Sequence, residues 1–60
     1  MYKVIAKQQR PNYKWEKTTV GPFIMKDEAD AAHDRQARIA RELLGRREII
    51  DYQIETIETT

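Results

Sequence analysis

The sequence contains no cysteine, so neither a disulfide nor a thiolate metal site can stabilise the fold. This absence fits a reducing compartment, and we expect a cytoplasmic location. No apolar run approaches the about 20 residues that a membrane span requires. The first residues, Met1 to Lys3, lead directly into an alternating pattern, without the apolar segment of a signal peptide. We therefore expect no contact with a membrane.

Sequence motifs of common enzymes are also missing, including glycine-rich phosphate loops and the GxSxG nucleophile turn. His33 is the only histidine, and it lies at the margin of the apolar side of a predicted helix. Because no cysteine or second histidine can converge on it, we interpret His33 as a partly packed ring rather than a metal ligand or a catalytic base. We predict a protein that is not an enzyme, with no catalytic residues, no metal, no cofactor and no small-molecule substrate.

A strong net charge is lacking as well, since 11 basic and 10 acidic side chains nearly cancel. A nearly neutral chain has no strong overall attraction to nucleic acids or to acidic membranes. The 60 residues suffice for one small domain, which we expect to cover residues 1–60. Its core can contribute only about 3–5 kcal/mol of stability.

A helical pattern over residues 27–44 dominates what the sequence does contain. Its apolar positions fall within one arc of roughly 100°, and alanines among them allow the helix to lie close to a sheet. Acidic residues come early in the helix and arginines late, which complements the helix dipole. Gly45 is predicted to be the left-handed residue that ends the helix. The apolar arc consists of Met25, Ala29, Ala32, Gln36, Ile39, Ala40 and Leu43.

Alternating apolar and polar residues predict three strands. Pro11 and Asn12 favour a hairpin turn after the first strand, and Gly21 with Pro22 is expected to end the second. The alternation does not decide which side of the second strand, and hence of Trp15, is buried. The predicted strands cover residues 2–8, 14–20 and 48–57.

The resulting ββαβ order predicts an α+β fold, in which a three-stranded antiparallel sheet of order 2-1-3 carries one α-helix on one face. Lys3 and Lys7 of the central strand would then face Asp51 and Glu55 of the third strand on the uncovered side. The predicted core consists of Val4, Phe23, Ala32, Ile39, Leu43, Ile50, Tyr52 and Ile54.

Two features of the helix allow more than one interpretation. Gln36 lies within the apolar arc, so its amide either bonds to the sheet backbone or to the hydroxyls of Tyr2 or Tyr52, or is covered only by a second chain. The arginines either grip phosphates or form a solvated face with an Asp34–Arg38 pair. The arginines in question are Arg35, Arg38, Arg41, Arg46 and Arg47.

The stretch Thr19–Phe23, followed by Glu28 and Ala29, resembles a strand-to-helix pattern of small phage and bacterial proteins. It is also similar to half of a SPOR-type repeat and to a passage of plant AP2-type DNA-binding domains. The resemblance covers about residues 19–40. A SPOR domain has two such units, and an AP2-type domain has three strands before its helix, so no functional residue is transferred from either family.

The expected function is a small non-enzymatic module that binds another protein or its own copy, encoded by a phage or a mobile element. Several isoleucines on the uncovered side suggest a contact patch, and acidic Asp51, Glu55 and Glu58 there would repel phosphate. The alternative is a nucleic-acid-binding module. Residues for the protein contact are Ile5, Trp15, Ile49 and Ile57. Residues for the nucleic-acid contact are Lys7, Lys14, Lys17, Arg38, Arg41, Arg46 and Arg47.

Overall fold

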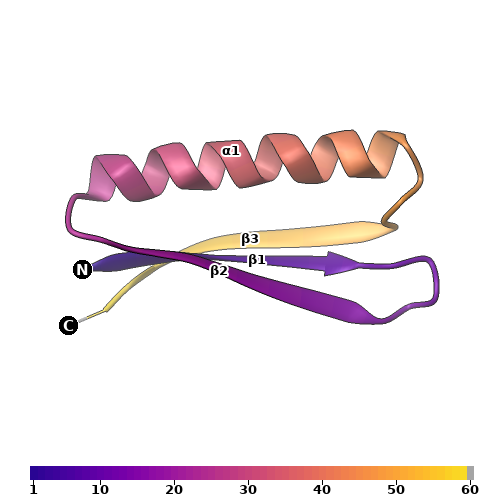
Figure 1. The fold of residues 1–60 in the computed structure, drawn as a ribbon, viewed down its shortest axis with the longest axis horizontal. Coiled ribbons are helices and arrows are strands. Elements are labelled where there is room, and N and C mark those ends of the chain that lie inside the picture. The colour runs from indigo at the N-terminus through magenta and orange to yellow at the C-terminus, as the bar shows by residue number, and fades with distance from the viewer. Residues whose placement is uncertain (60) are drawn as a thin grey trace.

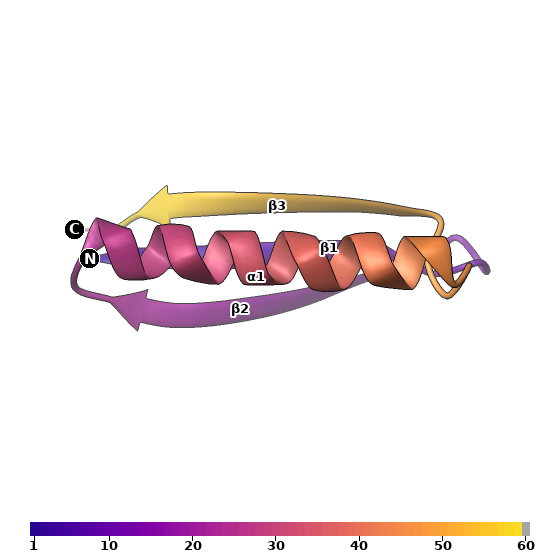
Figure 2. The same cartoon turned by 90° about the horizontal axis from the view of Figure 1, so that it is seen from above.

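Three strands and one helix make up the computed structural model, which describes residues 1–59. The strands form one antiparallel sheet in the order β2-β1-β3, and α1 lies along one face of it (Figure 1). Seen from above, α1 runs over β1, with β2 and β3 on either side (Figure 2). The predicted α+β fold and strand order are therefore confirmed. The elements are β1 (Tyr2–Gln9), β2 (Trp15–Phe23), α1 (Lys26–Gly45) and β3 (Asp51–Glu58).

The turn between β1 and β2 forms where proline and asparagine predict it. The Tyr13 N–H donates to the Arg10 carbonyl over 2.8 Å, and the Asn12 Oδ1 accepts from the Lys14 N–H over 3.1 Å. Tyr13 adopts a left-handed backbone with φ of 68°. This turn fixes the register of the hairpin, in which Gln9 lies opposite Trp15.

The register assigns each strand residue to one side of the sheet, because directly paired residues project to the same side. Val4 pairs with Val20 and Thr56, and Val4 packs against the helix residues Ala29 and Ala32. The residues that alternate with this set therefore point away from α1, and we call that side the open face. The open face consists of Lys3, Ile5, Lys7, Gln9, Trp15, Lys17, Thr19, Asp51, Gln53, Glu55 and Ile57.

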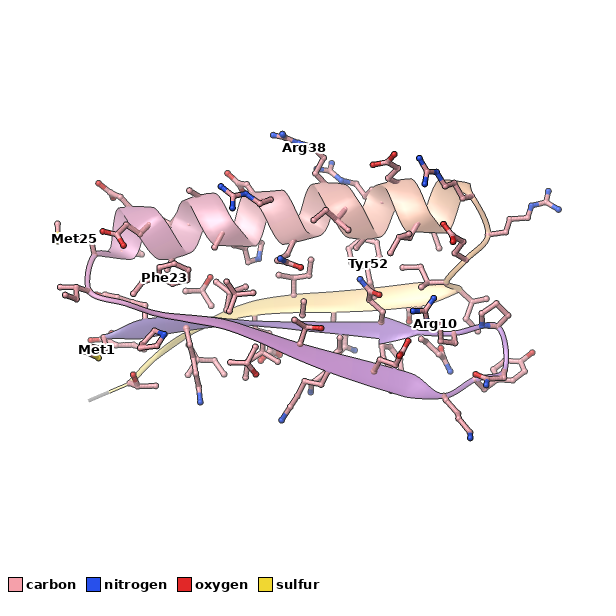
Figure 3. All side chains as sticks on the ribbon, in the orientation of Figure 1. Met1, Arg10, Phe23, Met25, Arg38 and Tyr52 are labelled. Atoms are coloured by element: carbon pink, nitrogen blue, oxygen red, sulfur yellow. The ribbon has the colours of Figure 1, made fainter. Side chains whose placement is uncertain are left out.

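Small side chains form most of the core. The buried residues of the described chain are apolar, and three of them are alanines of α1, which bring the helix close to the sheet. Larger side chains at the rim, among them Phe23 and Tyr52, lie between sheet and helix but are only partly buried (Figure 3). The buried residues are Val4, Ala6, Ala29, Ala32, Ala40 and Ile49.

Two members of the predicted core are exposed, and one predicted surface residue is buried. Ile50 is 43% exposed, whereas Ile49 is only 1% exposed. The prediction was wrong because β3 begins at Asp51 rather than at Glu48, so strand alternation does not extend to either isoleucine. Ile39 is 42% exposed because the twist of the sheet carries the start of β2 away from the helix (Figure 1).

The end of α1 also differs from the prediction. Gly45 is the last helical residue, and the left-handed residue is Arg47, with φ of 63°. The Arg47 N–H donates to the Leu44 carbonyl over 3.1 Å, and the Glu48 N–H to the Leu43 carbonyl over 3.0 Å. These two bonds are those of a Schellman motif, which satisfies the last carbonyls of the helix.

The second strand is longer than predicted, since β2 continues through Gly21 and Pro22 to Phe23. Gly21 has φ of 122° and lies against the backbone of β1, where an added Cβ would come within 3.2 Å of the Tyr2 carbonyl oxygen. Glycine thus lets an edge strand continue through a conformation that other residues rarely adopt.

The side-chain contacts of three predicted features of α1, namely His33, Gln36 and the arginines, can now be compared with the predictions. The His33 Nε2 lies 3.3 Å from the Ile54 carbonyl oxygen, which joins the middle of α1 to β3. Gln36 is half-buried, and among the described residues no side-chain hydrogen bond involves its amide, so the predicted bonds to tyrosines or sheet backbone are not found. Arg46 pairs with Glu42 over 2.7 Å, in place of the predicted Asp34–Arg38 pair.

Candidate binding face

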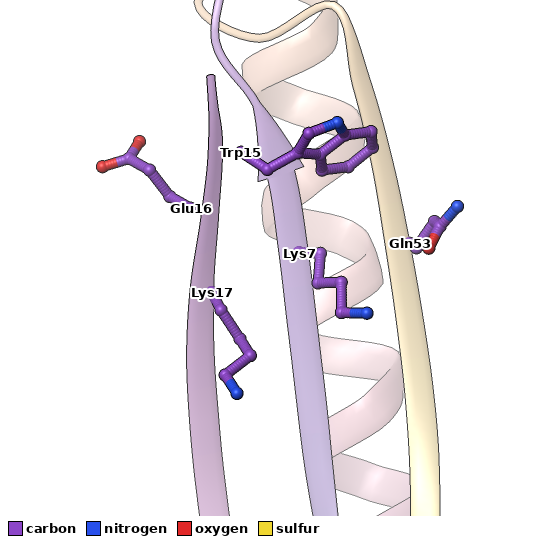
Figure 4. A pocket seen from close by; sticks show the side chains of 5 residues that line it. All are labelled: Lys7, Trp15, Glu16, Lys17 and Gln53. Atoms are coloured by element: carbon purple, nitrogen blue, oxygen red, sulfur yellow. The ribbon is translucent and has the colours of Figure 1, made fainter. Parts of the chain in front are cut away.

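The hairpin register places Trp15 on the open face, which settles the side that alternation leaves undecided. The indole lies across β1 toward β3, on the side of the sheet away from α1 (Figure 4). It is 46% exposed, so a large part of the ring is available to a ligand. An indole held against a sheet in this way is a stacking surface for a planar group.

Two lysines lie next to this ring. Lys7 of β1 pairs directly with Lys17 of β2, so two ammonium-bearing side chains project from adjacent positions on the same side. Like charges directly opposite each other on a sheet are destabilising. Neither lysine takes part in an ion pair among the described residues, whose charged pairs are Arg10–Glu16 and Arg46–Glu42, while the His33 ring lies 3.9 Å from Asp34. The repulsion is thus left for solvent ions or a ligand to relieve.

Trp15 and the two lysines border a shallow hollow of about 440 Å³, which Glu16 and Gln53 also line. Glu16 extends from the side of β2 away from the indole (Figure 4) and is bonded to the Arg10 guanidinium. Gln53 lies across from Lys7 on β3 and offers an amide to a bound group. Gln53 was not among the predicted contact residues, although its position between Asp51 and Glu55 in the strand alternation indicates this side.

The third strand, β3, adds carboxylate side chains to the open face. Asp51 and Glu55 are on it, but the register sets Lys7 opposite Gln53 and Lys3 opposite Ile57. The predicted lysine–carboxylate pairs are therefore diagonal neighbours rather than direct partners. Glu58 pairs with Tyr2 and belongs to the helix side, so its predicted place on the open face was wrong.

Charge is divided between the two ends of the molecule. Because His33 contacts Ile54 and Lys7 pairs with Gln53, residues 7–17 and 35–53 make up the end with the hairpin tip (Figure 1). This end carries nine basic and four acidic side chains, and the remainder carries two basic and six acidic ones. The nearly neutral total therefore conceals a basic end and an acidic end. The hollow beside Trp15 lies at the basic end.

The predicted contact residues are only partly brought together. Ile5, Trp15 and Ile57 share the open face, whereas Ile49 lies in the core. Of the predicted cationic residues, Lys7 and Lys17 share the open face, and Lys14 lies in the hairpin turn. Arg38 points away from the sheet on the outer side of α1 (Figure 3). One surface cannot include Arg38 together with the lysines of the open face.

No protein-family model, no curated protein and no solved structure matches this chain. In residues 1–59 there is no group of three or more histidine, cysteine, aspartate or glutamate side chains that could hold a metal ion. Within the same residues, no helix is long and apolar enough to cross a membrane.

Proposed function

We propose that this protein is a small non-enzymatic module that binds single-stranded nucleic acid on the β1–β2 half of its open face. The observation that carries the proposal is the exposed indole of Trp15 beside the directly paired Lys7 and Lys17. Proteins that bind single strands combine aromatic rings, on which bases stack, with cationic side chains along the backbone. The basic end of the molecule adds a favourable field around this site.

The acidic residues of β3 limit where a nucleic-acid strand can lie on the open face. Asp51 and Glu55 border the far side of the open face and would repel phosphate there. The nucleic-acid strand is therefore expected to follow β1 and β2, with one base stacked on Trp15 and neighbouring phosphates at Lys7 and Lys17. Gln53 lies beside the hollow, where its amide can bond to a base edge.

Binding is tested by titrating the protein into fluorescently labelled single-stranded DNA and RNA and following the fluorescence anisotropy of the label, because Trp15 is the only tryptophan and its own signal is lost in Trp15→Ala. Trp15→Ala should weaken binding by about five- to a hundredfold, because base–aromatic stacking is worth about 1–3 kcal/mol per base. Replacing both Lys7 and Lys17 by alanine should weaken binding and lower the salt slope by about 0.7 for each lost phosphate contact.

The controls separate this site from general charge effects. Lys26→Ala removes an exposed cation at the acidic end, and Arg38→Ala removes one on the outer side of α1, so both should leave the affinity nearly unchanged. A duplex of the same sequence should bind more weakly, since its bases cannot reach the indole. Equal effects of all these variants, or no binding at physiological salt, would contradict the proposal.

A protein partner is the second candidate function, and the isoleucines of the open face favour it. Ile5 and Ile57 are diagonal neighbours near the acidic end, away from the lysine pair. Such a patch suits a protein contact rather than a phosphate backbone. Two results together would favour this function. The parent protein would capture a protein partner that the variant with Ile5→Glu and Ile57→Lys no longer binds, and the parent would show no salt-dependent binding of oligonucleotides.

A further inference from the structure

A second hollow, of about 350 Å³, lies on the other side of the sheet, between α1 and β2. Val20 and Phe23 of β2 and Ala31 and Ala32 of α1 provide its apolar lining. It is separate from the open face, because Val20 belongs to the side of the sheet that faces the helix. The outer edge of β2 beside it has no neighbouring strand, since the sheet order is β2-β1-β3.

One acidic and one basic side chain also line this hollow, and neither forms an ion pair within residues 1–59. Glu28 and Arg35 are seven residues apart on α1, about 10 Å along the helix axis. The ion pairs among the described residues include neither of them. Ala31 and Ala32 lie midway between the two charges.

We propose that this side of the molecule binds a second copy of the chain about a two-fold axis level with Ala31 and Ala32. A two-fold contact joins the same surface of both copies, so the surface must be complementary to itself. This axis is perpendicular to α1, so the two helices lie antiparallel. It sets Glu28 of each copy opposite Arg35 of the other. Two ion pairs therefore form across the contact from side chains that have no ion-pair partner in the described part of the single chain.

Exposed apolar residues fit the same arrangement. Ile39 is one turn beyond Arg35 on α1 and is exposed because its own β2 leaves it uncovered. In the antiparallel pair, Ile39 comes level with Ile24 of the second copy, which is also exposed. The two β2 edges lie antiparallel beside each other, where strand addition can contribute backbone hydrogen bonds. Both open faces remain uncovered, so the contact does not depend on nucleic-acid binding.

Sedimentation velocity over a range of protein concentrations tests this contact. The parent chain should self-associate, and Glu28→Arg or Arg35→Glu alone should each weaken association by about tenfold or more, since each places two like-charge pairs at the axis. An equimolar mixture of the two variants should recover the dimer, because the arginine introduced in one variant then meets the glutamate introduced in the other, while the unchanged Glu28 and Arg35 still pair. The double variant with both changes should also dimerise by itself.

Matched controls are available on the outer side of α1. Asp34→Arg and Arg41→Glu reverse an exposed acid and an exposed base with the same spacing of seven residues, and both should leave association unchanged. Circular dichroism checks that every variant remains folded. A parent chain that stays monomeric, single variants that associate like the parent, or a mixture that fails to recover the dimer would each overturn the proposal.

Discussion

Single residues at the ends of elements decide where side chains go in this fold. Ile49 and Ile50 are adjacent and chemically identical, yet one is buried and the other is exposed. The Schellman motif ends at Glu48, and the Ile50 N–H donates to the Gln9 carbonyl over 2.8 Å, so the two isoleucines lie in a connection with its own geometry. Alternation applies only inside a strand. For this reason the sequence pattern predicted Ile50 to be buried and Ile49 to be exposed, whereas the opposite is found.

The difference between these isoleucines is measurable as stability. Ile49→Ala should lower the free energy of unfolding by about 2–5 kcal/mol, because it removes a fully buried side chain and leaves a cavity. Ile50→Ala should cost much less, since much of its side chain is already in water. Urea unfolding of the two variants makes the comparison. A larger loss for Ile50→Ala would restore the strand pattern that the sequence predicts.

At the scale of elements, periodicity predicts the helix and the strands well, because each pattern depends on neighbours in the sequence. The order of the elements and the absence of long connections then leave few topologies, and the sheet order follows. Periodicity could not predict how much of the apolar side of α1 the sheet covers, or which side of the sheet Trp15 occupies. The exposure of Ile39 depends on the twist of β2, and the side of Trp15 depends on the hairpin register, so both require the assembled sheet.

The end of α1 provides a test at this scale. Gly45 lies within the helix, and an added Cβ would meet no atom within 4 Å, so Gly45→Ala should stabilise the protein by about 0.5–1 kcal/mol. A glycine in the left-handed position would give the opposite sign. Thermal unfolding of the variant against the parent distinguishes the two, and a lower melting temperature would show that Gly45 is the cap.

At the scale of the whole molecule, topology separates charges that the sequence mixes. Acidic and basic side chains nearly cancel over the chain, and the composition alone indicates no nucleic-acid partner. The fold brings the hairpin tip and the end of α1 to the same end of the molecule (Figure 1), which concentrates the basic residues there. This distribution, together with the position of Trp15, changes the order of the two functional hypotheses.

The most direct test of the central claim is an amide chemical-shift titration of the protein with a short single-stranded oligonucleotide at physiological salt. The β1–β2 open-face mechanism predicts shifts at the Trp15 indole N–H and at the amides of Lys7, Lys17 and Gln53, with the outer side of α1 unaffected. Shifts centred on the arginines of α1, or no shifts at all, would contradict it.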